Sequence, residues 1–375
     1  MALKYLFFLL TLSAVVWFFS GRKKQGQHGV QPRRTRERRE PTLSDKFDRR
    51  RGRADLQKGE AAYARGDYVA ALAEFRPLAE QGAAEAQNNL GFMYDNGHGV
   101  SQDHAQAAAW YHKAAAQGNA AAQCNLGIMF RYGRGTPSND THAFAWFRQA
   151  AVSGLAQAQR HLGDMYCFGE GVELDQAQAF DWYTKAAEQG NAIAQCNLAA
   201  LYDNCPELQD HDQAFAWYHK AAAQGNAEAQ YNLGLSYDWA IGVKQDFVKA
   251  AEWLASAAEQ SHAGAQCALG DKYFDGLGVS ADESKAIVLY RSAAQQGLSR
   301  AFFKLGMKYS NGNGVRRDDE VAYALISQAI IQEQEGAARY LEGMVSSMTH
   351  SQIEAGKALT CQMQRVGVLR VLDSR

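Results

Sequence analysis

Proline and cysteine are scarce in this chain, which has five prolines and six cysteines among 375 residues. So few cysteines exclude a small disulfide-stapled scaffold. The 34 glycines follow no strict triplet period, which excludes a collagen-like chain. Aromatic residues are not scarce: 17 Phe, 17 Tyr and 7 Trp supply enough apolar material for an ordered core, so a wholly disordered chain is excluded as well.

The motifs of common catalytic and metal sites are also missing. The chain has no His-Glu-x-x-His, Gly-x-Ser-x-Gly or Cys-x-x-Cys. Its one Ser-x-x-Lys, from Ser20 to Lys23, ends an apolar N-terminal segment, and the Lys-Thr-Gly that accompanies this motif in β-lactamases is absent. We therefore expect no catalytic residue, no cofactor and no metal ion.

The formal net charge of −1 hides two parts of opposite sign. Residues 1–20 carry +1 from Lys4, and residues 21–53 carry +9 from thirteen basic and four acidic side chains. Subtracting both from the total leaves −11 for residues 54–375. A basic arm therefore precedes an acidic body.

The first twenty residues predict an uncleaved transmembrane anchor. Their apolar run extends from Tyr5 to Phe19, close to the roughly 17–25 residues that a spanning helix needs. A secretory signal peptide is the alternative, although no small-x-small cleavage site follows the run. Because basic residues follow, the positive-inside rule predicts a cytoplasmic body. Export to the periplasm is the alternative, and a reporter fused after Arg53 would distinguish the two compartments.

Residues 21–53 are expected to be a disordered linker. Their basic side chains, from Arg22 to Arg53, could also contact anionic lipid, at about 1 kcal/mol for each charge near the surface. Because Phe47 is the only aromatic residue of the arm, it offers no platform on which bases could stack. We expect no nucleic-acid partner.

The chain after the arm repeats one motif with a period of 35–36 residues. The pair Leu-Gly, once Leu-Ala, recurs at this spacing, and its leucine is called here the central Leu of each repeat. The central leucines are Leu90, Leu126, Leu162, Leu198, Leu233, Leu269 and Leu305. A Trp runs in step from Trp110 to Trp253 and is replaced by Leu289 and Leu325 in the last two repeats.

Each repeat predicts two helices joined by a loop. An Ala four residues before the central Leu and an aromatic residue four after it share one face of the first helix, and the Gly after the Leu lets a neighbouring helix approach. A Gly-x-Gly loop such as Gly97–Gly99 then reverses the chain through positive φ angles. An acid or amide caps the second helix, and the Trp is expected to fill the space between the two helices. The predicted caps are Asp103, Asn139, Asp175, Asp210, Asp246, Asp282 and Asp318.

The domain boundaries follow from this period. Residues 54–82 predict a hairpin that turns at Gly66 and Asp67 before the repeats begin. Residues 337–375 predict a degenerate capping repeat and tail, with Ser351 and Glu354 as a capping box. The seven repeats between them are 83–118, 119–154, 155–190, 191–225, 226–261, 262–297 and 298–336.

The pattern Ala-x-x-x-Leu-Gly-x-Met-Tyr-x-x-Gly-x-Gly-Val, then Asp-x-x-x-Ala-x-x-Trp-Tyr-x-Lys-Ala-Ala-x-x-Gly, resembles the Sel1-like repeat, a longer-loop relative of the tetratricopeptide repeat. It stands almost intact at Ala86–Gly118 and Ala158–Gly190, and covers roughly residues 83–336. The resemblance implies an all-α fold, a right-handed α/α superhelix (solenoid) of helical hairpins, and a role as a scaffold for protein complexes, often at membranes. Asp203–Glu207 departs from the pattern by replacing the Gly loop of the fourth repeat.

Two positions of the first helix do not repeat: two residues before and two after the central Leu, opposite the buried face. They read Asn88/Phe92, Cys124/Ile128, Arg160/Asp164, Cys196/Ala200, Tyr231/Leu235, Cys267/Asp271 and Phe303/Met307. These side chains either pack on the next repeat or line the inner surface of the solenoid and bind a protein or peptide partner. We expect binding for Phe92, Arg160, Asp164, Tyr231, Leu235, Phe303 and Met307.

Cys124, Cys196 and Cys267 share one repeat position, which suggests a metal site or disulfides as a first interpretation. Equivalent positions in stacked repeats lie roughly 10 Å apart, beyond the limit of ~7 Å between the Cα atoms of a disulfide. We expect small, semi-buried side chains instead. His161 and Cys167 are close in sequence but lack the further ligands of a metal site.

The sequence thus predicts a membrane-anchored repeat scaffold that binds another protein through its inner surface and is not an enzyme. Two alternatives stay open. One is an exported periplasmic adaptor. The other is a β-lactamase-like hydrolase built on the repeats, which would have to show turnover that one point substitution abolishes.

Overall fold

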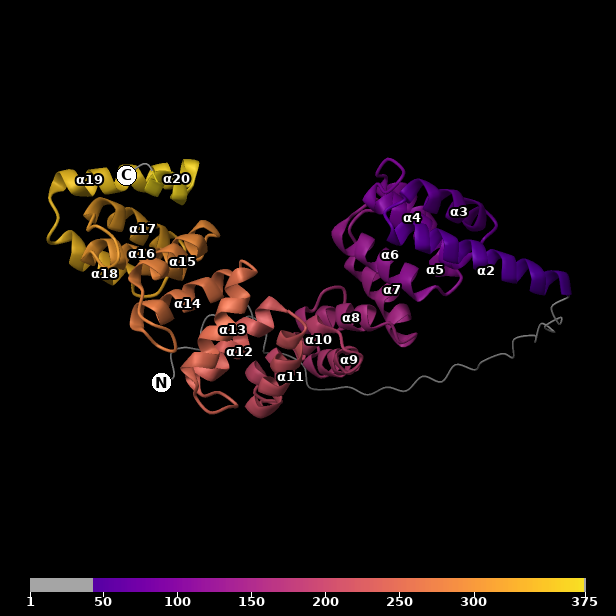
Figure 1. Cartoon of the computed structure of the whole chain (residues 1–375), viewed down its shortest axis with the longest axis horizontal. Coiled ribbons are helices and arrows are strands. Elements are labelled where there is room, and N and C mark those ends of the chain that lie inside the picture. The colour runs from indigo at the N-terminus through magenta and orange to yellow at the C-terminus, as the bar shows by residue number, and fades with distance from the viewer. Residues whose placement is uncertain (1–42, 374–375) are drawn as a thin grey trace, which may run out of the picture. The chain divides into compact units, whose positions relative to one another are not determined.

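The computed structural model describes residues 43–373, and the regular elements in that range are all α-helices (Figure 1). The chain divides into two compact units, Met1–Arg51 and Gly52–Arg375, and the architecture described below is that of the second. The predicted membrane anchor and residues 21–42 of the predicted linker lie outside the described residues. Helix α2 (Leu43–Ala64) begins within the predicted linker, so the last eleven residues of that linker, 43–53, are helical.

The helices alternate as A and B helices of successive repeats, after a first hairpin of α2 and α3 (Tyr68–Glu80). The A helices of repeats 1 to 7 are α4 (Ala84–Asn96), α6 (Ala120–Tyr132), α8 (Ala156–Phe168), α10 (Ala192–Asn204), α12 (Ala227–Trp239), α14 (Ala263–Asp275) and α16 (Ser299–Asn311). The B helices are α5 (His104–Ala116), α7 (Asp140–Val152), α9 (Gln176–Glu188), α11 (His211–Ala223), α13 (Phe247–Glu259), α15 (Glu283–Gln295) and α17 (Asp319–Ile331). Each B helix packs on the A helix of its own repeat, and B helices α5 to α15 also pack on the A helix of the next repeat. The second unit is therefore an α-helical repeat solenoid, as the sequence predicts.

The predicted caps and loops of the repeats are confirmed. All seven capping side chains accept a backbone N–H of the first turn; that of Asp103, for example, accepts the N–H of Gln106 at 2.9 Å. The glycines of the five Gly-x-Gly loops have φ angles between 65° and 79°. In repeat 5, Ala240 also has a positive φ angle, in the left-handed conformation. In repeat 4, Cys205 follows the end of α10 and does not adopt this conformation.

The tightest contact inside a repeat joins the glycine of the A helix to a large side chain of the B helix. A methyl group on Gly163 would lie 2.6 Å from the ring of Tyr183, closer than real Cβ contacts come. The same separation is 2.6–2.9 Å in all six repeats that carry the glycine. The B-helix residues at this contact are Tyr111, Phe147, Tyr183, Leu254, Tyr290 and Ile326. The predicted role of the glycine, close approach of a neighbouring helix, is confirmed.

The prediction that the Trp fills this interface is wrong. The residue after each Trp, such as Tyr111 after Trp110, is the one that is fully buried, while the Trp itself is half-buried. One residue along a helix turns a side chain by about 100°, which takes the Trp to the edge of the interface. There the rings of Trp110, Trp182 and Trp217 each contact a lysine one turn later: the Nζ of Lys113, for example, lies 3.7 Å from the ring centroid of Trp110.

A buried glutamine three residues before the central Leu connects successive repeats. Gln159 donates its Nε2 to the carbonyl of Ala151 in the preceding B helix at 3.2 Å, and its Oε1 accepts the Nε2 of Gln189 at 2.7 Å. The same two bonds recur at Gln87, Gln195, Gln230 and Gln266. A buried polar group without its partner costs about 1–3 kcal/mol, so these bonds fix how each repeat sits on the one before.

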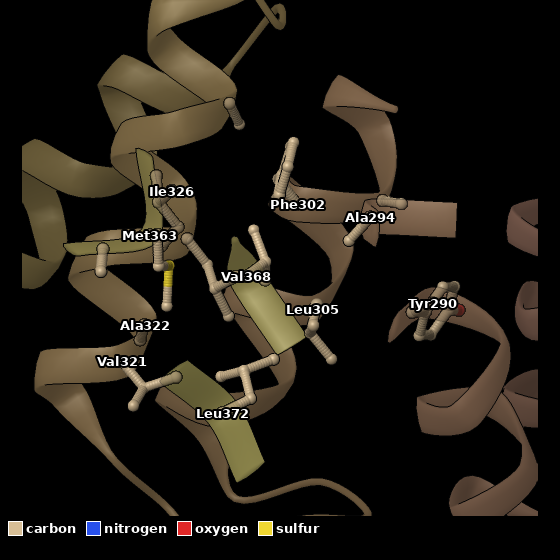
Figure 2. Packing of buried hydrophobic residues seen from close by; sticks show 14 of the residues in the cluster. Tyr290, Ala294, Phe302, Leu305, Val321, Ala322, Ile326, Met363, Val368 and Leu372 are labelled. Atoms are coloured by element: carbon tan, nitrogen blue, oxygen red, sulfur yellow. The ribbon is translucent and has the colours of Figure 1, made fainter. Parts of the chain in front are cut away.

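The C-terminal segment ends the stack differently from the predicted degenerate repeat. It comprises α18 (Ala337–Val345), α19 (His350–Val366) and α20 (Val368–Asp373). Helix α19 packs on α17 rather than pairing with α18, and α20 turns back to α15 (Figure 1). Figure 2 shows Val368 and Leu372 of α20 near Leu305 in the core of the last repeats. The tail thus covers that core itself.

The predicted capping box of α19 is also wrong by two residues. The box is formed by Thr349 and Gln352: the Thr349 side chain accepts the N–H of Gln352, whose own side chain accepts the N–H of Thr349. Ser351 and Glu354 lie inside the helix, where Glu354 pairs with Lys357 at 2.8 Å. The helix begins earlier than the sequence suggested because Thr349 supplies an equivalent cap.

Substitution of Gly163 by Val tests the helix contact. The branched side chain would overlap the Tyr183 ring, so Gly163→Val should destabilise the fold by about 1–3 kcal/mol, measured by urea denaturation. Gly343→Val is the control, because nothing lies within 4 Å of a Cβ at this exposed helical glycine; it should change stability by less than about 0.5 kcal/mol. Equal effects at both positions would contradict the proposed packing.

Candidate partner-binding surface

Three positions of each A helix lie on one stripe: two residues before the central Leu, two after it and six after it, because a spacing of four keeps one helical face. This stripe across the seven A helices is called here the A-face. Adjacent A helices contact each other at this stripe and beside it. Asn88 of the A-face accepts the Nδ2 of Asn125 at 3.1 Å, and Asp271 of the A-face accepts from Arg300 at 2.7 Å; the two donors lie just outside the stripe. The A-face therefore continues from repeat to repeat.

Phe92 and the four predicted residues of repeats 5 and 7 lie on three helices of the A-face: α4, α12 and α16. Phe92 is 41% exposed. Tyr231, Leu235, Phe303 and Met307 are half-buried. The ring of Tyr231 lies 4.7 Å from that of His262, and Phe303 meets Tyr340 edge-on at 5.7 Å, so both also contact the following repeat. The partner-binding role of these residues stays a prediction.

Arg160 and Asp164 are the two predicted residues that the structure brings together. Their side chains pair at 2.6 Å, and Asp164 also accepts the hydroxyl of Tyr183 at 2.8 Å and the Nδ2 of Asn197 at 3.1 Å. Burial raises the pKa of Asp164 above its usual value, although Arg160 and Tyr183 act in the opposite direction. The pair thus connects α8, α9 and α10. This network could not be predicted from the spacing of A-helix residues, because it depends on a tyrosine of the B helix.

The third position of the stripe, six residues after the central Leu, was not among the predicted positions. It reads Asn96, Tyr132, Phe168, Asn204, Trp239, Asp275 and Asn311. Tyr132 and Phe168 are each 62% exposed, and Trp239 is 42% exposed. Extending the stripe by one further helical turn along the sequence would have identified these three exposed aromatic residues.

The three cysteines that share a repeat position are buried free thiols. Burial raises the pKa of Cys124, Cys196 and Cys267 to about 12, so they are protonated and unreactive at neutral pH. In the described part of the chain, no group of three or more His, Cys, Asp or Glu side chains is placed to hold a metal ion.

His161 is buried beneath the A-face. Its ring stacks on Phe147 with centroids 4.6 Å apart, and its Nε2 lies 2.6 Å from the guanidinium of Arg160. Burial lowers the pKa of His161 to about 3, with Arg160 and Arg131 acting in the same direction. A neutral imidazole is therefore part of the packing between repeats 2 and 3.

Acidification should destabilise the protein through His161. Its folded-state pKa lies below the ordinary value of about 6.5, so the unfolded state takes up the proton first, and the stability present above pH 6.5 is lost as the pH falls toward 3. Between pH 7 and pH 5 this loss is about 2 kcal/mol. Asn occupies this position in four other repeats; His161→Asn should therefore lose about 2 kcal/mol less than the wild type in urea titrations at the two pH values.

The exposed His112 provides the matched control for this measurement. The variant His112→Asn should keep the full pH response of the wild type. A His161→Asn variant with an unchanged pH response would show that the buried imidazole is not the source of the acid sensitivity.

Comparison with known proteins agrees with this architecture. The family model described as "Sel1 repeat" matches residues 84–119, 120–154, 156–191, 192–226, 227–262, 263–298 and 299–333. A protective antigen of uropathogenic Escherichia coli strains with an SLR fold is 32% identical, with a TM-score of 0.57 over 88% of this chain and 79% of that one. A Sel1 repeat protein from Oxalobacter formigenes is 31% identical, with a TM-score of 0.60 over 64% of this chain and 96% of that one. No curated protein matches the chain.

Proteins built from these repeats generally mediate protein–protein interactions as scaffolds, and they are typically not enzymes. The seven matches together cover more than half of the chain. The chain therefore belongs to the Sel1 repeat family.

Proposed function

We propose that this chain is a scaffold that binds a protein partner along the A-face of its solenoid. The location of the exposed aromatic side chains supports the proposal. Between Gly52 and Asp373, four Phe, Tyr or Trp side chains are exposed, and all four belong to the A-face: Phe92, Tyr132, Phe168 and Trp239. Exposed aromatic rings favour protein interfaces, because they bury a large apolar area and lose little side-chain entropy.

The region from α6 to α8 is the best-developed part of this surface. Tyr132 and Phe168 occupy the same position in adjacent repeats. Between them, Arg131 pairs with Glu170 and lies with its guanidinium carbon 5.8 Å from the ring centroid of Tyr132. Charged groups that already have partners beside exposed rings resemble the polar rim and aromatic core of an interface. Many of the other A-face positions differ from repeat to repeat, which favours the selection of particular partners over non-specific apolar binding.

We further propose that the scaffold is anchored in a membrane and faces the cytoplasm. The support for this is the apolar sequence of residues 1–20 and the basic residues that follow it. None of the helices between Leu43 and Asp373 is long and apolar enough to cross a bilayer. An adaptor in the periplasm is the alternative for the same binding surface, and the reporter fusion after Arg53 decides between them.

Site-specific crosslinking tests the proposed surface. With benzoylphenylalanine in place of Phe168, the full-length chain should crosslink to a defined protein partner. In place of Val152, which is 72% exposed on B helix α7, the same group should give at most a tenth of that yield. A ring at the centre of an interface contributes about 1–3 kcal/mol, so adding Tyr132→Ala should reduce the yield at position 168 at least fivefold at limiting partner concentration. Equal yields from positions 152 and 168 would contradict the proposal.

A further inference from the structure

A small hollow opens at the N-terminal end of the A-face, between α2, α3 and α4. It has a volume of about 160 Å³ and is lined by Glu60, Tyr63, Phe75, Asn89 and Phe92. Of these lining residues Phe75 is buried, whereas Phe92 and Glu60 are exposed. A volume of this size has room for several water molecules or for one long side chain. The hollow thus adjoins the surface proposed above.

Two of the rings that line the hollow are held in place before anything binds. Tyr63 and Phe92 meet edge to face, with centroids 6.0 Å apart and planes at 69°. The Tyr63 hydroxyl forms a hydrogen bond of 2.6 Å with Nδ1 of His98, and the His98 ring stacks on Tyr68 with centroids 4.3 Å apart. Because this cluster fixes both rings, a ligand loses little affinity to ordering them.

Aromatic faces beside a carboxylate attract a cation. Ring faces carry the negative end of the ring quadrupole, and they attract an ammonium or guanidinium placed over them. The solenoid uses this contact within its own repeats, where Lys185 lies 4.1 Å from the ring centroid of Trp182. In the hollow, no Lys or Arg from residues 52–373 lies over the ring of Tyr63 or Phe92.

We propose that this hollow binds a Lys or Arg side chain of the protein partner that lies along the A-face, with Glu60 pairing the charge and Tyr63 and Phe92 contacting it with their rings. The proposal rests on the proposed scaffold function and names part of the partner's chemistry. Charge complementarity supports it, because residues 54–375 carry a formal charge of −11 and attract basic segments. The partner is therefore expected to present a basic residue at the N-terminal end of the surface.

A fluorine label in the hollow tests the proposal directly. The full chain with 4-fluorophenylalanine in place of Phe92 is titrated with the methylamide of Nα-acetyl-lysine, and with that of Nα-acetyl-norleucine as the uncharged probe of similar shape. The ¹⁹F resonance should respond to the lysine amide with at least fivefold higher affinity. In Glu60→Gln this preference should fall below twofold, whereas Glu80→Gln, an exposed carboxylate of α3 outside the hollow, should keep it.

Equal affinity for the two probes, or a preference unchanged by Glu60→Gln, would overturn the proposal. Glu60 is exposed, so its substitution should leave the unfolding midpoint unchanged and the result interpretable. Crosslinking at position 168 is a separate measurement. If it succeeds while the ¹⁹F resonance does not respond to the lysine amide, the proposed binding of a basic side chain in the hollow is wrong, but the proposed scaffold function is not affected.

The basic arm of the chain itself is the competing occupant. A variant with Gln in place of five arginines of the arm tests this: Arg33, Arg34, Arg36, Arg38 and Arg39. If the arm filled the hollow, this variant would shift the ¹⁹F resonance without ligand and would bind the lysine amide more tightly, which would overturn the assignment to a partner. An unchanged resonance and affinity support it.

Discussion

The contact between a glycine of the A helix and a large side chain of the B helix sets the geometry of every repeat that has it. A methyl group at Gly127 or Gly163 would already be too close to the ring of Phe147 or Tyr183. Because this contact fixes the distance between the two helices, and the buried glutamines fix one repeat on the next, the interior leaves little freedom. Some buried positions, such as His161 and Asp164, also differ from repeat to repeat, but on the A-face several of the differing side chains are exposed.

The A-face itself performs two different tasks. Asp164, which pairs with Arg160, accepts the buried hydroxyl of Tyr183 and connects helices, and Asp271 accepts the hydroxyl of Tyr290 at 2.7 Å. The ring of Phe168, in contrast, is 62% exposed and lies where a partner can reach it. The non-repeating residues therefore do not form a uniform binding surface. Some make hydrogen bonds that stabilise one particular repeat, and others are exposed and available to bind a partner.

The features that depend on residue spacing could be predicted from the sequence, whereas the burial of individual side chains could not. The period, the caps and the positive φ of the loop glycines follow from local chemistry, so they could be read from the chain. Trp182 and Tyr183 are adjacent aromatic residues, and the rotation of the two helices about their axes decides which of them enters the interface. Because both residues belong to the repeating pattern, the pattern alone does not distinguish them. The tail was misjudged for a related reason, since α19 packs on α17 by tertiary contacts that no repeat encodes. At the candidate site, the stripe was identified but stopped one turn short of Tyr132 and Phe168.

Hydrogen exchange on the complex with a crosslinked partner tests the central claim most directly. Backbone amides covered by a partner exchange more slowly, and the proposed surface predicts that the added protection is concentrated at the C-terminal turns of α6, α8 and α12 and in the loops that follow them. B helices α7, α9 and α13 should exchange as they do in the free chain. Protection confined to those B helices, with the A helices unchanged, would contradict the account.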